Sequence, residues 1–385
     1  MGEAENSPIL AQRGVLMRVL EITVSSGFGG GPQHIFELVS RLKNNNVEID
    51  IACPNEEPYW KRFHALASGQ LVEIPHRYFS LKTAWRLVNH VRRNKINIVH
   101  SHGKGSGVYG RFVAALTGLP LIHTPHGIHL DQYGRAMRAI YQVYEKLTGS
   151  ISSVVIFVSE SERERAQSLG FWRSVPWQVI SNGVSSWPTD LVTNWRQSLR
   201  QAQGISEDEV VVVSLSRFDY PKNMKEMALI AKQTSDASFW FLGDGTERSE
   251  IQAFCDAHAP GRVWFPGFVE DPVRYLAAAD IYLSTSRWEG LPLAILEAMS
   301  LGKPVVASDV TGNRDAVKNE ETGFFYNLGD VKQASSCLLR LIENVDLRHR
   351  LGSNGQERQR RLFSVDTMAT QTLAVYQTLM TGKCK

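Results

Sequence analysis

The sequence is poor in cysteine and has no long hydrophobic run, and each scarcity excludes a class of protein. Its four cysteines are scattered and form no C-x-x-C pair, so neither a zinc knuckle nor a disulfide framework is expected. The longest apolar segments, 153–159 and 210–215, are far shorter than the roughly 20 residues that a membrane-spanning helix needs. We therefore expect buried strands at these segments and a cytoplasmic protein, with contact at the inner face of the membrane left open.

Two metal-binding patterns are also missing. No D-x-D motif, which could hold a divalent ion against a diphosphate, occurs in the chain, and no histidines have the H-E-x-x-H spacing. Five histidines do cluster in two short stretches of the first half: His100, His102, His123, His126 and His129. They stand at predicted strand ends and loops, so we expect no metal site and no bound cofactor.

What is present is the composition of an ordinary folded enzyme, 43% hydrophobic and 21% charged over 385 residues. That length fits two domains of about 150 to 200 residues each. The net charge is only +3, but residues 1–180 hold 20 Lys and Arg against 14 Asp and Glu. A basic first half is compatible with an anionic acceptor or an anionic membrane surface as partner, and a solvated basic face explains the pattern equally well. We expect no nucleic-acid partner.

From Met17 onward the chain alternates short β-branched runs with amphipathic stretches, which is typical of an α/β fold with parallel sheets covered by helices. The pattern pauses near 182–195, which is rich in Asn, Ser, Thr and Trp around single Gly and Pro residues, and then restarts. We therefore predict two doubly wound, Rossmann-like domains that face each other across a cleft. The predicted divisions are an N-terminal extension (1–16), a first domain (17–185), a second domain (186–363) and a C-terminal helix packing back toward the first domain (364–385).

The most specific stretch of the sequence is the one in which Glu289 and Glu297 are separated by seven residues. Pro292 suits the first turn of a helix, so the backbone N–H groups of Gly290 and Leu291 are expected to point outward. Such a helix start binds anions such as a diphosphate. Glu297, in the second turn, can accept two hydrogen bonds from the cis-diol of a ribose. In isolation, the two carboxylates also suit a helix N-terminal charge and a surface residue.

This stretch resembles the E-x7-E signature of the retaining glycosyltransferases of family 4 (glycosyl transferases group 1), and the resemblance covers nearly the whole chain from Met17. It implies the two-domain architecture called GT-B, with 17–185 on the acceptor side and 186–363 binding a nucleotide-sugar. It also implies that Glu289 contacts the donor sugar and that Glu297 binds the ribose hydroxyls.

Two basic residues follow the first strand of the second domain. Arg217 stands at the strand end and Lys222 comes after a proline turn, so both can reach one phosphate. In the resembling family this pair neutralises the diphosphate leaving group, on which negative charge develops as the glycosidic bond breaks. Solvated pairs with this spacing are common, so the assignment depends on the place of the pair in the second domain.

A glycine-rich loop, G-F-G-G-G-P, follows the first strand and lets a ligand approach the backbone. It does not fit the dinucleotide-binding pattern G-x-G-x-x-G, because Pro32 stands where the third glycine, counted from Gly27, is required. A nicotinamide-dependent enzyme is therefore disfavoured. In the resembling family, Gly30 and Gly31 lie beside the diphosphate across the cleft.

The resemblance implies two further assignments. His126, in T-P-H-G, matches the family histidine that approaches the donor sugar. The nucleotide base would be held by backbone groups near Gly243, Phe268 and Val269. Backbone groups are the same in every residue, so the sequence does not distinguish UDP from GDP as the nucleotide that carries the donor sugar. UDP is assigned on family frequency alone.

The function that the resemblance implies is retaining, metal-independent transfer of a hexose from a nucleotide-sugar to a glycan or lipid-linked acceptor, in surface polysaccharide or glycoconjugate biosynthesis. Arg217, Lys222 and the helix start at Gly290 would stabilise the leaving diphosphate while an acceptor hydroxyl attacks from the same face. Two alternatives stay open: a non-hydrolysing nucleotide-sugar epimerase of the same fold, and a catalytically silent nucleotide-sugar-binding subunit.

One segment of the first domain, 80–95, predicts a basic amphipathic helix. Leu81, Ala84, Trp85 and Val88 recur at helical spacing beside five Lys and Arg residues. Such a helix can lie on an anionic membrane and meet a lipid-linked acceptor there. Because any helix that covers a Rossmann sheet needs one apolar face, packing on the sheet is the favoured interpretation of this segment.

Overall fold

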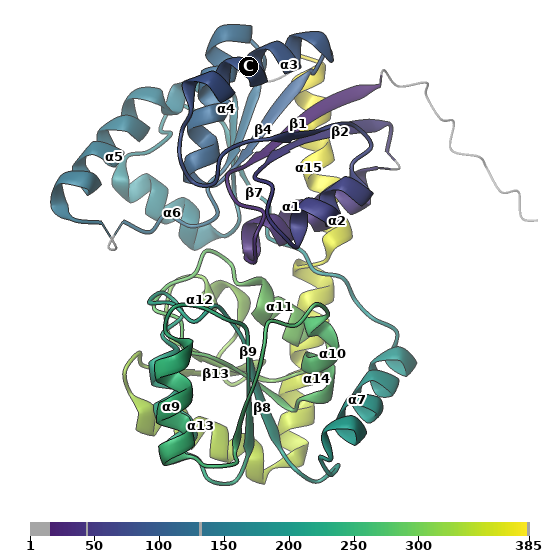
Figure 1. Ribbon diagram of the computed structural model, residues 1–385, viewed down its shortest axis with the longest axis vertical. Coiled ribbons are helices and arrows are strands. Elements are labelled where there is room, and N and C mark those ends of the chain that lie inside the picture. Colours follow the sequence, from purple (N-terminus) through teal and green to yellow (C-terminus); the bar gives the residue numbers. More distant parts are fainter. Residues whose placement is uncertain (1–15, 44, 131–132, 383–385) are drawn as a thin grey trace, which may run out of the picture.

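This computed structural model has two α/β domains, one above the other in Figure 1, and each is built on a parallel sheet. The structure describes residues 16–43, 45–130 and 133–382. The predicted N-terminal extension therefore lies outside the described residues, apart from Leu16. The predicted fold class, two doubly wound Rossmann-like domains, is confirmed.

The first domain is built on a seven-stranded parallel sheet with the strand order β3-β2-β1-β4-β5-β6-β7. Its strands are β1 (Met17–Thr23), β2 (Val47–Cys53), β3 (Leu71–Glu73), β4 (Ile98–His102), β5 (Leu121–Thr124), β6 (Val154–Phe157) and β7 (Trp177–Val179). The helices that connect them are α1 (Gly30–Leu42), α2 (Tyr59–Leu66), α3 (Leu81–Arg93), α4 (Lys104–Thr117), α5 (Arg135–Thr148) and α6 (Glu160–Leu169).

Helices cover both faces of this sheet. Successive residues of a strand point to opposite faces, so apolar side chains on each face pack against the helices there. Val19 of β1 packs in one core with Ile35 and Leu38 of α1. The next residue, Leu20, packs in the other core with Leu87 of α3 and with residues of α4. Burial on both sides explains why a strand such as β6 reads as a continuous apolar run.

The second domain has a six-stranded parallel sheet with the order β10-β9-β8-β11-β12-β13. Its strands are β8 (Val211–Leu215), β9 (Ser238–Leu242), β10 (Val263–Gly267), β11 (Ile281–Ser284), β12 (Val305–Ser308) and β13 (Gly323–Tyr326). Its helices are α7 (Thr189–Gln203), α8 (Met224–Gln233), α9 (Arg248–His258), α10 (Pro272–Ala278), α11 (Leu293–Ser300), α12 (Asn313–Ala316), α13 (Val331–Glu343) and α14 (Val345–Leu362).

Both sheets reverse their strand order at the same place. In the first domain the reversal falls between β1 and β4, and in the second between β8 and β11. Loops at the carboxyl ends of strands diverge at such a point and leave a crevice in which ligands bind. The glycine-rich loop follows β1, the Arg217 and Lys222 loop follows β8, and the Glu289 loop follows β11. The topology therefore directs the predicted ligand-binding loops to these two crevices.

The chain crosses between the domains twice, and the two crossings lie side by side. The N–H of Val184 donates to Phe363 O at 2.9 Å, and the N–H of Val365 donates to Val184 O at 3.3 Å. A Cβ atom on Gly183 would lie only 2.5 Å from Ser364 O. Glycine is therefore required where the two crossings touch.

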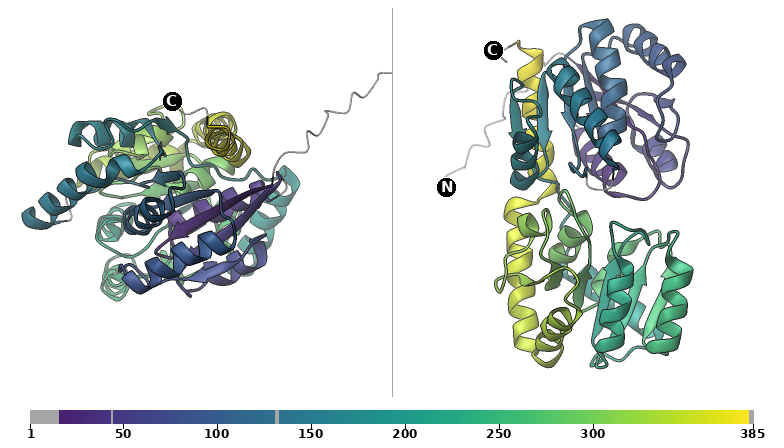
Figure 2. Two further views of the ribbon diagram at one scale, coloured as in Figure 1. Left: turned by 90° about the horizontal axis from the view of Figure 1, so that it is seen from above. Right: turned by 90° about the vertical axis from the view of Figure 1, so that its left-hand side faces the viewer.

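After the second crossing, α15 (Val365–Met380) returns to the first domain. Met368, Val375 and Tyr376 of this helix are buried in the same core as α1. Figure 2 shows α14 and α15 following one another along one side of both domains. The C-terminal helix thus adds side chains to a sheet that the chain left about two hundred residues earlier.

The segment predicted to be amphipathic forms α3, which Ser80 caps by accepting a hydrogen bond from Thr83 N. Its predicted apolar face is divided in two. Ala84 and Val88 are fully buried, as packing on the sheet requires, whereas Leu81 and Trp85 are 55% and 47% exposed. Within the described part of the chain, no helix has the length and apolarity to cross a bilayer.

Candidate active site

The loops that follow the central strands meet where the two domains face each other. A Cβ atom placed on Gly30, at the start of α1, would lie 3.8 Å from Leu293 Cδ1 of the second domain. A Cβ atom placed on Gly290 would lie 3.2 Å from the backbone nitrogen of Gly127, in the loop after β5. Gly31 has open space around it. The glycines predicted to approach a diphosphate are therefore at the domain interface.

The helix start at α11 differs slightly from the prediction. Pro292 has a helical φ of −75° but an extended ψ of 111°, so it is the N-cap and the helix begins at Leu293. The prediction that Pro292 occupies the first turn was wrong by one position. Leu291 is buried, and its carbonyl oxygen accepts a hydrogen bond from Asn182 Nδ2 at 2.8 Å. This bond ties the loop before α11 to the first crossing between the domains.

The structure brings Lys222 and Glu289 together. Lys222 Nζ donates to Glu289 Oε1 at 2.5 Å, and Ser286 Oγ donates to the same oxygen at 2.6 Å. Arg217 is paired with Asp219 at 3.0 Å, and its side chain is 41% exposed. Lys222 and Arg217, the two side chains predicted to bind phosphate, thus each have a carboxylate partner. A bound diphosphate would share the cation with that carboxylate or displace it.

Glu297 stands in the second turn of α11 and is partly buried. Burial, followed by the charge of Glu37 on α1, raises the pKa of Glu297 to about 8. Burial likewise raises the pKa of Glu37. No side chain among the described residues donates a hydrogen bond to the Glu297 carboxylate, so a ligand hydroxyl would supply a partner that the protein does not.

His126 lies in a strained turn. Its φ is 56° and that of Gly127 is 107°, both in the left-handed region that non-glycine residues rarely adopt. The Glu162 carboxylate holds the turn, because it accepts hydrogen bonds from the N–H of Gly127 and, at 2.8 Å, from the N–H of Val158. Burial raises the pKa of Glu162 to about 7.

A chain of hydrogen bonds leads from a buried carboxylate to His126. Glu21 Oε2 lies 2.6 Å from His102 Nε2, and His102 Nδ1 lies 3.0 Å from His126 Nε2. Tyr376 of α15 donates to the other oxygen of Glu21 at 2.7 Å. Burial alone raises the pKa of Glu21, but His100 and His102 outweigh it and hold that pKa well below its usual value.

This chain assigns the tautomers of the two histidines. Burial, followed by the charge of His100, lowers the pKa of His102 to about 4, so the ring is neutral at pH 7 and carries one N–H. The ionised Glu21 can only accept, which places the His102 proton on Nε2 and leaves Nδ1 as an acceptor. His126 must then donate from Nε2, so its Nδ1 carries a lone pair. Burial also holds the pKa of His126 well below its ordinary value.

The imidazoles of His34, His102 and His126 lie close enough together to be tested as metal ligands, with their ligand atoms within 4.8 Å of one another. Both ring nitrogens of His102 already have hydrogen-bond partners. The 3.0 Å between the nitrogens of His102 and His126 is the length of a hydrogen bond. The cluster therefore fits a hydrogen-bond network.

Several members of this network had no role in the sequence analysis: Glu21, His34, Asn182 and Tyr376. His34 Nδ1 lies 3.0 Å from Asn182 Oδ1, which links the His126 region to the domain crossing. One signal could have identified Glu21, which is an acidic residue between the apolar Leu20 and Ile22 of a central strand. Nothing in the local pattern pairs it with Tyr376.

The residues predicted to hold the base differ in exposure. A Cβ atom on Gly243, where φ is 124°, would collide with Ser216 O, so this turn requires glycine. Val269 is buried, whereas Phe268 is 41% exposed. The Phe268 ring lies 3.5 Å, centroid to centroid, from the ring of Phe28 in the glycine-rich loop. The two domains therefore touch through aromatic rings at this side of the interface.

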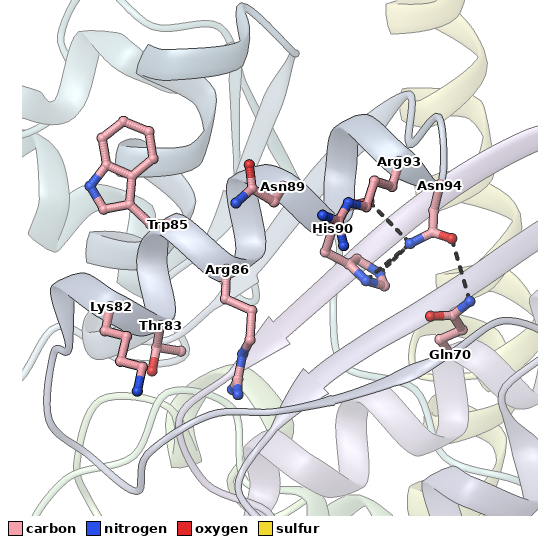
Figure 3. A pocket seen from close by; sticks show the side chains of 9 residues that line it. All are labelled: Gln70, Lys82, Thr83, Trp85, Arg86, Asn89, His90, Arg93 and Asn94. Atoms are coloured by element: carbon pink, nitrogen blue, oxygen red, sulfur yellow. Dashed lines mark hydrogen bonds between the residues drawn. The ribbon is translucent and has the colours of Figure 1, made fainter.

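A separate groove of about 800 Å³ runs along α3 (Figure 3). It is lined by Gln70, Lys82, Thr83, Trp85, Arg86, Asn89, His90, Arg93 and Asn94. None of the residues predicted to bind the donor lines it. The groove is a basic surface feature of the first domain.

Comparison with known proteins assigns the family. The model of the family described as "Glycosyl transferases group 1" matches residues 196–358, and that described as "Glycosyltransferase Family 4" matches residues 28–186. The UDP-Gal:alpha-D-GlcNAc-diphosphoundecaprenol alpha-1,3-galactosyltransferase of Escherichia coli is 27% identical over 323 residues, which cover 80% of this chain and 83% of the relative. The N,N'-diacetylbacillosaminyl-diphospho-undecaprenol alpha-1,3-N-acetylgalactosaminyltransferase of Campylobacter jejuni is 23% identical over 334 residues, 83% of this chain and 88% of the relative.

Solved structures show the same fold. The structure of HepE from Anabaena in complex with UDP-glucose matches with a TM-score of 0.82 at 19% sequence identity, and the match covers 94% of this chain and 100% of that one. The two family models span one domain each and both describe glycosyltransferases. The chain therefore belongs to the family 4 (group 1) glycosyltransferases and has their two-domain GT-B fold.

Proposed function

We propose that this glycosyltransferase moves a sugar from a UDP-sugar to a lipid-linked glycan acceptor, with retention of anomeric configuration and without a metal ion. The observation that carries the proposal is the contact between Lys222 and Glu289, with Arg217 in the same loop as Lys222. These residues follow the adjacent strands β8 and β11, at the strand-order reversal where a nucleotide binds in such sheets.

The leaving group is the diphosphate of the nucleotide. As the bond from the sugar to the phosphate breaks, negative charge develops on the phosphate oxygens, and cations placed in advance stabilise it. Lys222 and Arg217 supply that charge, and the backbone at Gly290 and Leu291 precedes the positive end of α11. In this scheme Glu289 holds Lys222 in place and contacts the donor sugar, while Glu297 accepts from the ribose hydroxyls.

In this scheme the transfer uses no metal ion, and the nucleotide-sugar is a co-substrate rather than a bound cofactor. The task that a divalent ion performs in other transferases, neutralising the diphosphate, falls to Arg217 and Lys222. The absence of a D-x-D motif supports this assignment.

The acceptor and the carrier are proposed from the relatives. The names of the Escherichia coli and Campylobacter jejuni relatives specify acceptors built on diphosphoundecaprenol and an α-1,3 linkage. The Escherichia coli name specifies UDP-Gal as donor, and the Anabaena structure holds UDP-glucose. We infer a UDP-sugar donor, a lipid-linked acceptor met at an anionic membrane surface on the cytoplasmic side, and a place in surface polysaccharide or glycoconjugate assembly.

Retention is the stereochemical part of the proposal. An acceptor hydroxyl that attacks from the face the diphosphate leaves would conserve an α configuration. His126, held as the Nε2–H tautomer, would lie beside the donor sugar and contribute a neutral hydrogen-bonding group there.

The proposal is tested by incubating the protein with UDP-glucose, UDP-galactose or UDP-N-acetylglucosamine, with and without a monosaccharide linked to polyprenyl diphosphate. We expect UDP to be released with one donor and only when the acceptor is present, and NMR of the product to show an α linkage. Conversion of the donor sugar without acceptor would identify an epimerase instead. Binding of UDP without any turnover would indicate a silent subunit, and a β-linked product would contradict retention.

A further inference from the structure

Helix α5 (Arg135–Thr148) exposes a stripe of large apolar side chains. Met137, Ile140, Val143 and Leu147 are 55%, 63%, 55% and 74% exposed. They recur every three or four residues, so they share one face of the helix. We call these four residues the α5 stripe. No other helix in the described ranges exposes more than two large apolar side chains.

Another face of α5 packs against the first domain and is held in place. Glu145 is buried and forms a two-pronged ion pair with Arg111 of α4, at 3.2 and 2.6 Å. Tyr141 packs edge-on against Phe171, with ring centroids 6.0 Å apart. Turning the stripe inward would break this buried pair and leave both charges unpaired. The stripe is therefore a fixed outer surface of the domain.

The exposed charged side chains of α5 are all basic. Besides Glu145, which is buried and paired, the charged residues of the helix are Arg135, Arg138 and Lys146. Arg135 and Lys146 are exposed. An apolar stripe flanked only by basic side chains is complementary to the interface of an anionic bilayer, where acyl chains meet the stripe and lipid phosphates meet the cations.

A second copy of this chain is a poorer occupant. Two copies paired through the stripe about a two-fold axis would bring α5 against α5. Because the exposed charges of the helix are all basic, such a pair would set basic side chains of one copy near basic side chains of the other, and like charges repel. The bilayer supplies the opposite charge that a second copy lacks.

The position of α5 connects the stripe to the catalytic cleft. The helix follows the loop that carries His126, and Figure 1 shows it at the outer edge of the first domain. Lys104 Nζ donates to His129 O in that loop at 2.7 Å, and the His129 ring lies 5.8 Å from Trp288 of the second domain. A single loop thus connects α5 to the interface between the domains.

We propose that the α5 stripe inserts among the headgroups of an anionic bilayer, with Arg135 and Lys146 contacting lipid phosphates, and so brings the cleft to its acceptor. This inference deepens the proposed function and rests on its lipid-linked acceptor. The sequence placed a possible membrane contact on α3, but half of the predicted apolar face of that helix is buried. The α5 stripe is exposed throughout.

The test is co-sedimentation of the full chain with vesicles of phosphatidylglycerol and phosphatidylcholine, and with vesicles of phosphatidylcholine alone. We expect binding to the anionic vesicles and at least about tenfold weaker partitioning for the variant Ile140→Ser with Leu147→Ser. Arg135→Gln with Lys146→Gln should weaken binding mainly at low salt, since surface attraction is screened within about 10 Å at 0.1 M. The matched control is Leu229→Ser with Val345→Ser, which removes exposed apolar side chains from the second domain and should bind as the wild type does.

Three results would overturn the proposal: no vesicle binding by the wild type, equal binding by the stripe variant, or loss of binding by Leu81→Ser with Trp85→Ser alone, which would assign docking to α3. A wild-type dimer that the stripe variant dissociates, seen by light scattering, would identify a second copy as the occupant. UDP binding, measured by thermal shift on the same samples, should be equal in all variants. Failure of the wild type to bind UDP would reject the proposed function and leave the vesicle result to stand on its own.

Discussion

His102 Nδ1 lies 3.0 Å from His126 Nε2, and the other nitrogen of His102 lies 2.6 Å from the buried carboxylate of Glu21. The two bonds form one relay from the core of the first domain to the domain interface. An ionised Glu21 can only accept, so the relay places a proton on Nε2 of each imidazole. Glu21 and His102 therefore act on His126 as positioning residues, through its tautomer and its ring orientation.

Replacing Glu21 by Gln should reverse this relay. The Gln amide can donate to His102 Nε2, which moves the His102 proton to Nδ1 and forces His126 Nε2 to accept. We expect kcat to fall about 10- to 100-fold, the equivalent of the roughly 1.5–3 kcal/mol of a hydrogen bond to a charged group, with little change in donor KM. Nitrogen NMR should show the His126 proton on Nδ1.

Tyr376→Phe is the control for this prediction, because it removes one hydrogen bond to Glu21 and leaves the carboxylate charge in place. It should keep the His126 tautomer of the wild type. If Glu21→Gln and Tyr376→Phe lower kcat equally, with the tautomer unchanged in both, the network is structural only.

Glu297→Gln should stabilise the unliganded protein at alkaline pH. The pKa of Glu297 is raised from 4.5 to about 8 by burial and then by Glu37. Below pH 4.5 the group is protonated in both the folded and the unfolded chain. Between these values only the folded protein keeps the proton, so stability falls as pH rises and the full loss is present above about pH 8. The Tm of the variant should exceed that of the wild type at pH 8, and the two should converge near pH 5.

Above about pH 8, where the Glu297 carboxylate is ionised, the same variant should bind the donor more weakly, by about 1.5–3 kcal/mol, because in the proposed site the ribose hydroxyls lose a charged acceptor. Glu164→Gln, on an exposed face of α6, is the control and should change neither property. A Glu297→Gln protein with wild-type donor affinity would remove Glu297 from the ribose site, whatever its Tm.

Lys222→Met should reduce affinity for UDP about 10- to 100-fold, since a charge-assisted contact to the diphosphate contributes about 1.5–3 kcal/mol. It also leaves Glu289 without its cation, so kcat should fall as well. Lys225→Met is the matched control: Lys225 pairs with Glu250 at 2.9 Å on α8 and α9. Calorimetric titration with UDP compares the two, and equal affinities would place the diphosphate elsewhere.

Excess EDTA should leave the transfer rate nearly unchanged, because in the proposed mechanism Arg217 and Lys222 neutralise the diphosphate in place of a divalent ion. The measurement compares initial rates before and after removal of metal by a chelating resin. Activity that is lost and then restored by manganese or magnesium would show that the enzyme uses a metal. In that case His34, His102 and His126 would be the first ligands to test.

The fold and much of the site follow from local sequence patterns. Apolar runs that alternate with amphipathic stretches specify parallel strands and covering helices, and the chemistry-bearing residues Arg217 and Glu289 come directly after such runs. Since parallel strands end at one edge of a sheet, loops that follow neighbouring strands converge there. For this reason the loops of Lys222 and Glu289 could be assigned to one region, although the two residues are 67 positions apart; their ion pair was not predicted.

The buried relay could not be anticipated in the same way. Tyr376 and Glu21 are 355 positions apart, and they meet only because α15 crosses back onto the first sheet. No periodicity within either segment encodes that contact. The tautomer of His126 depends on it through burial and charge, which are properties of the assembled core.

The sequence by itself therefore determined the two α/β domains and the loops on which the predicted donor-binding residues stand, because hydrophobic periodicity and strand order act locally. The tertiary structure alone decided which apolar faces are covered. The spacing of Met137, Ile140 and Leu147 on α5 is as regular as that of any core-facing helix, yet the ion pair of Glu145 with Arg111 turns this stripe outward. On α3 only part of the apolar face is buried. Ala84 and Val88 pack against the sheet, whereas Trp85 stays at the surface.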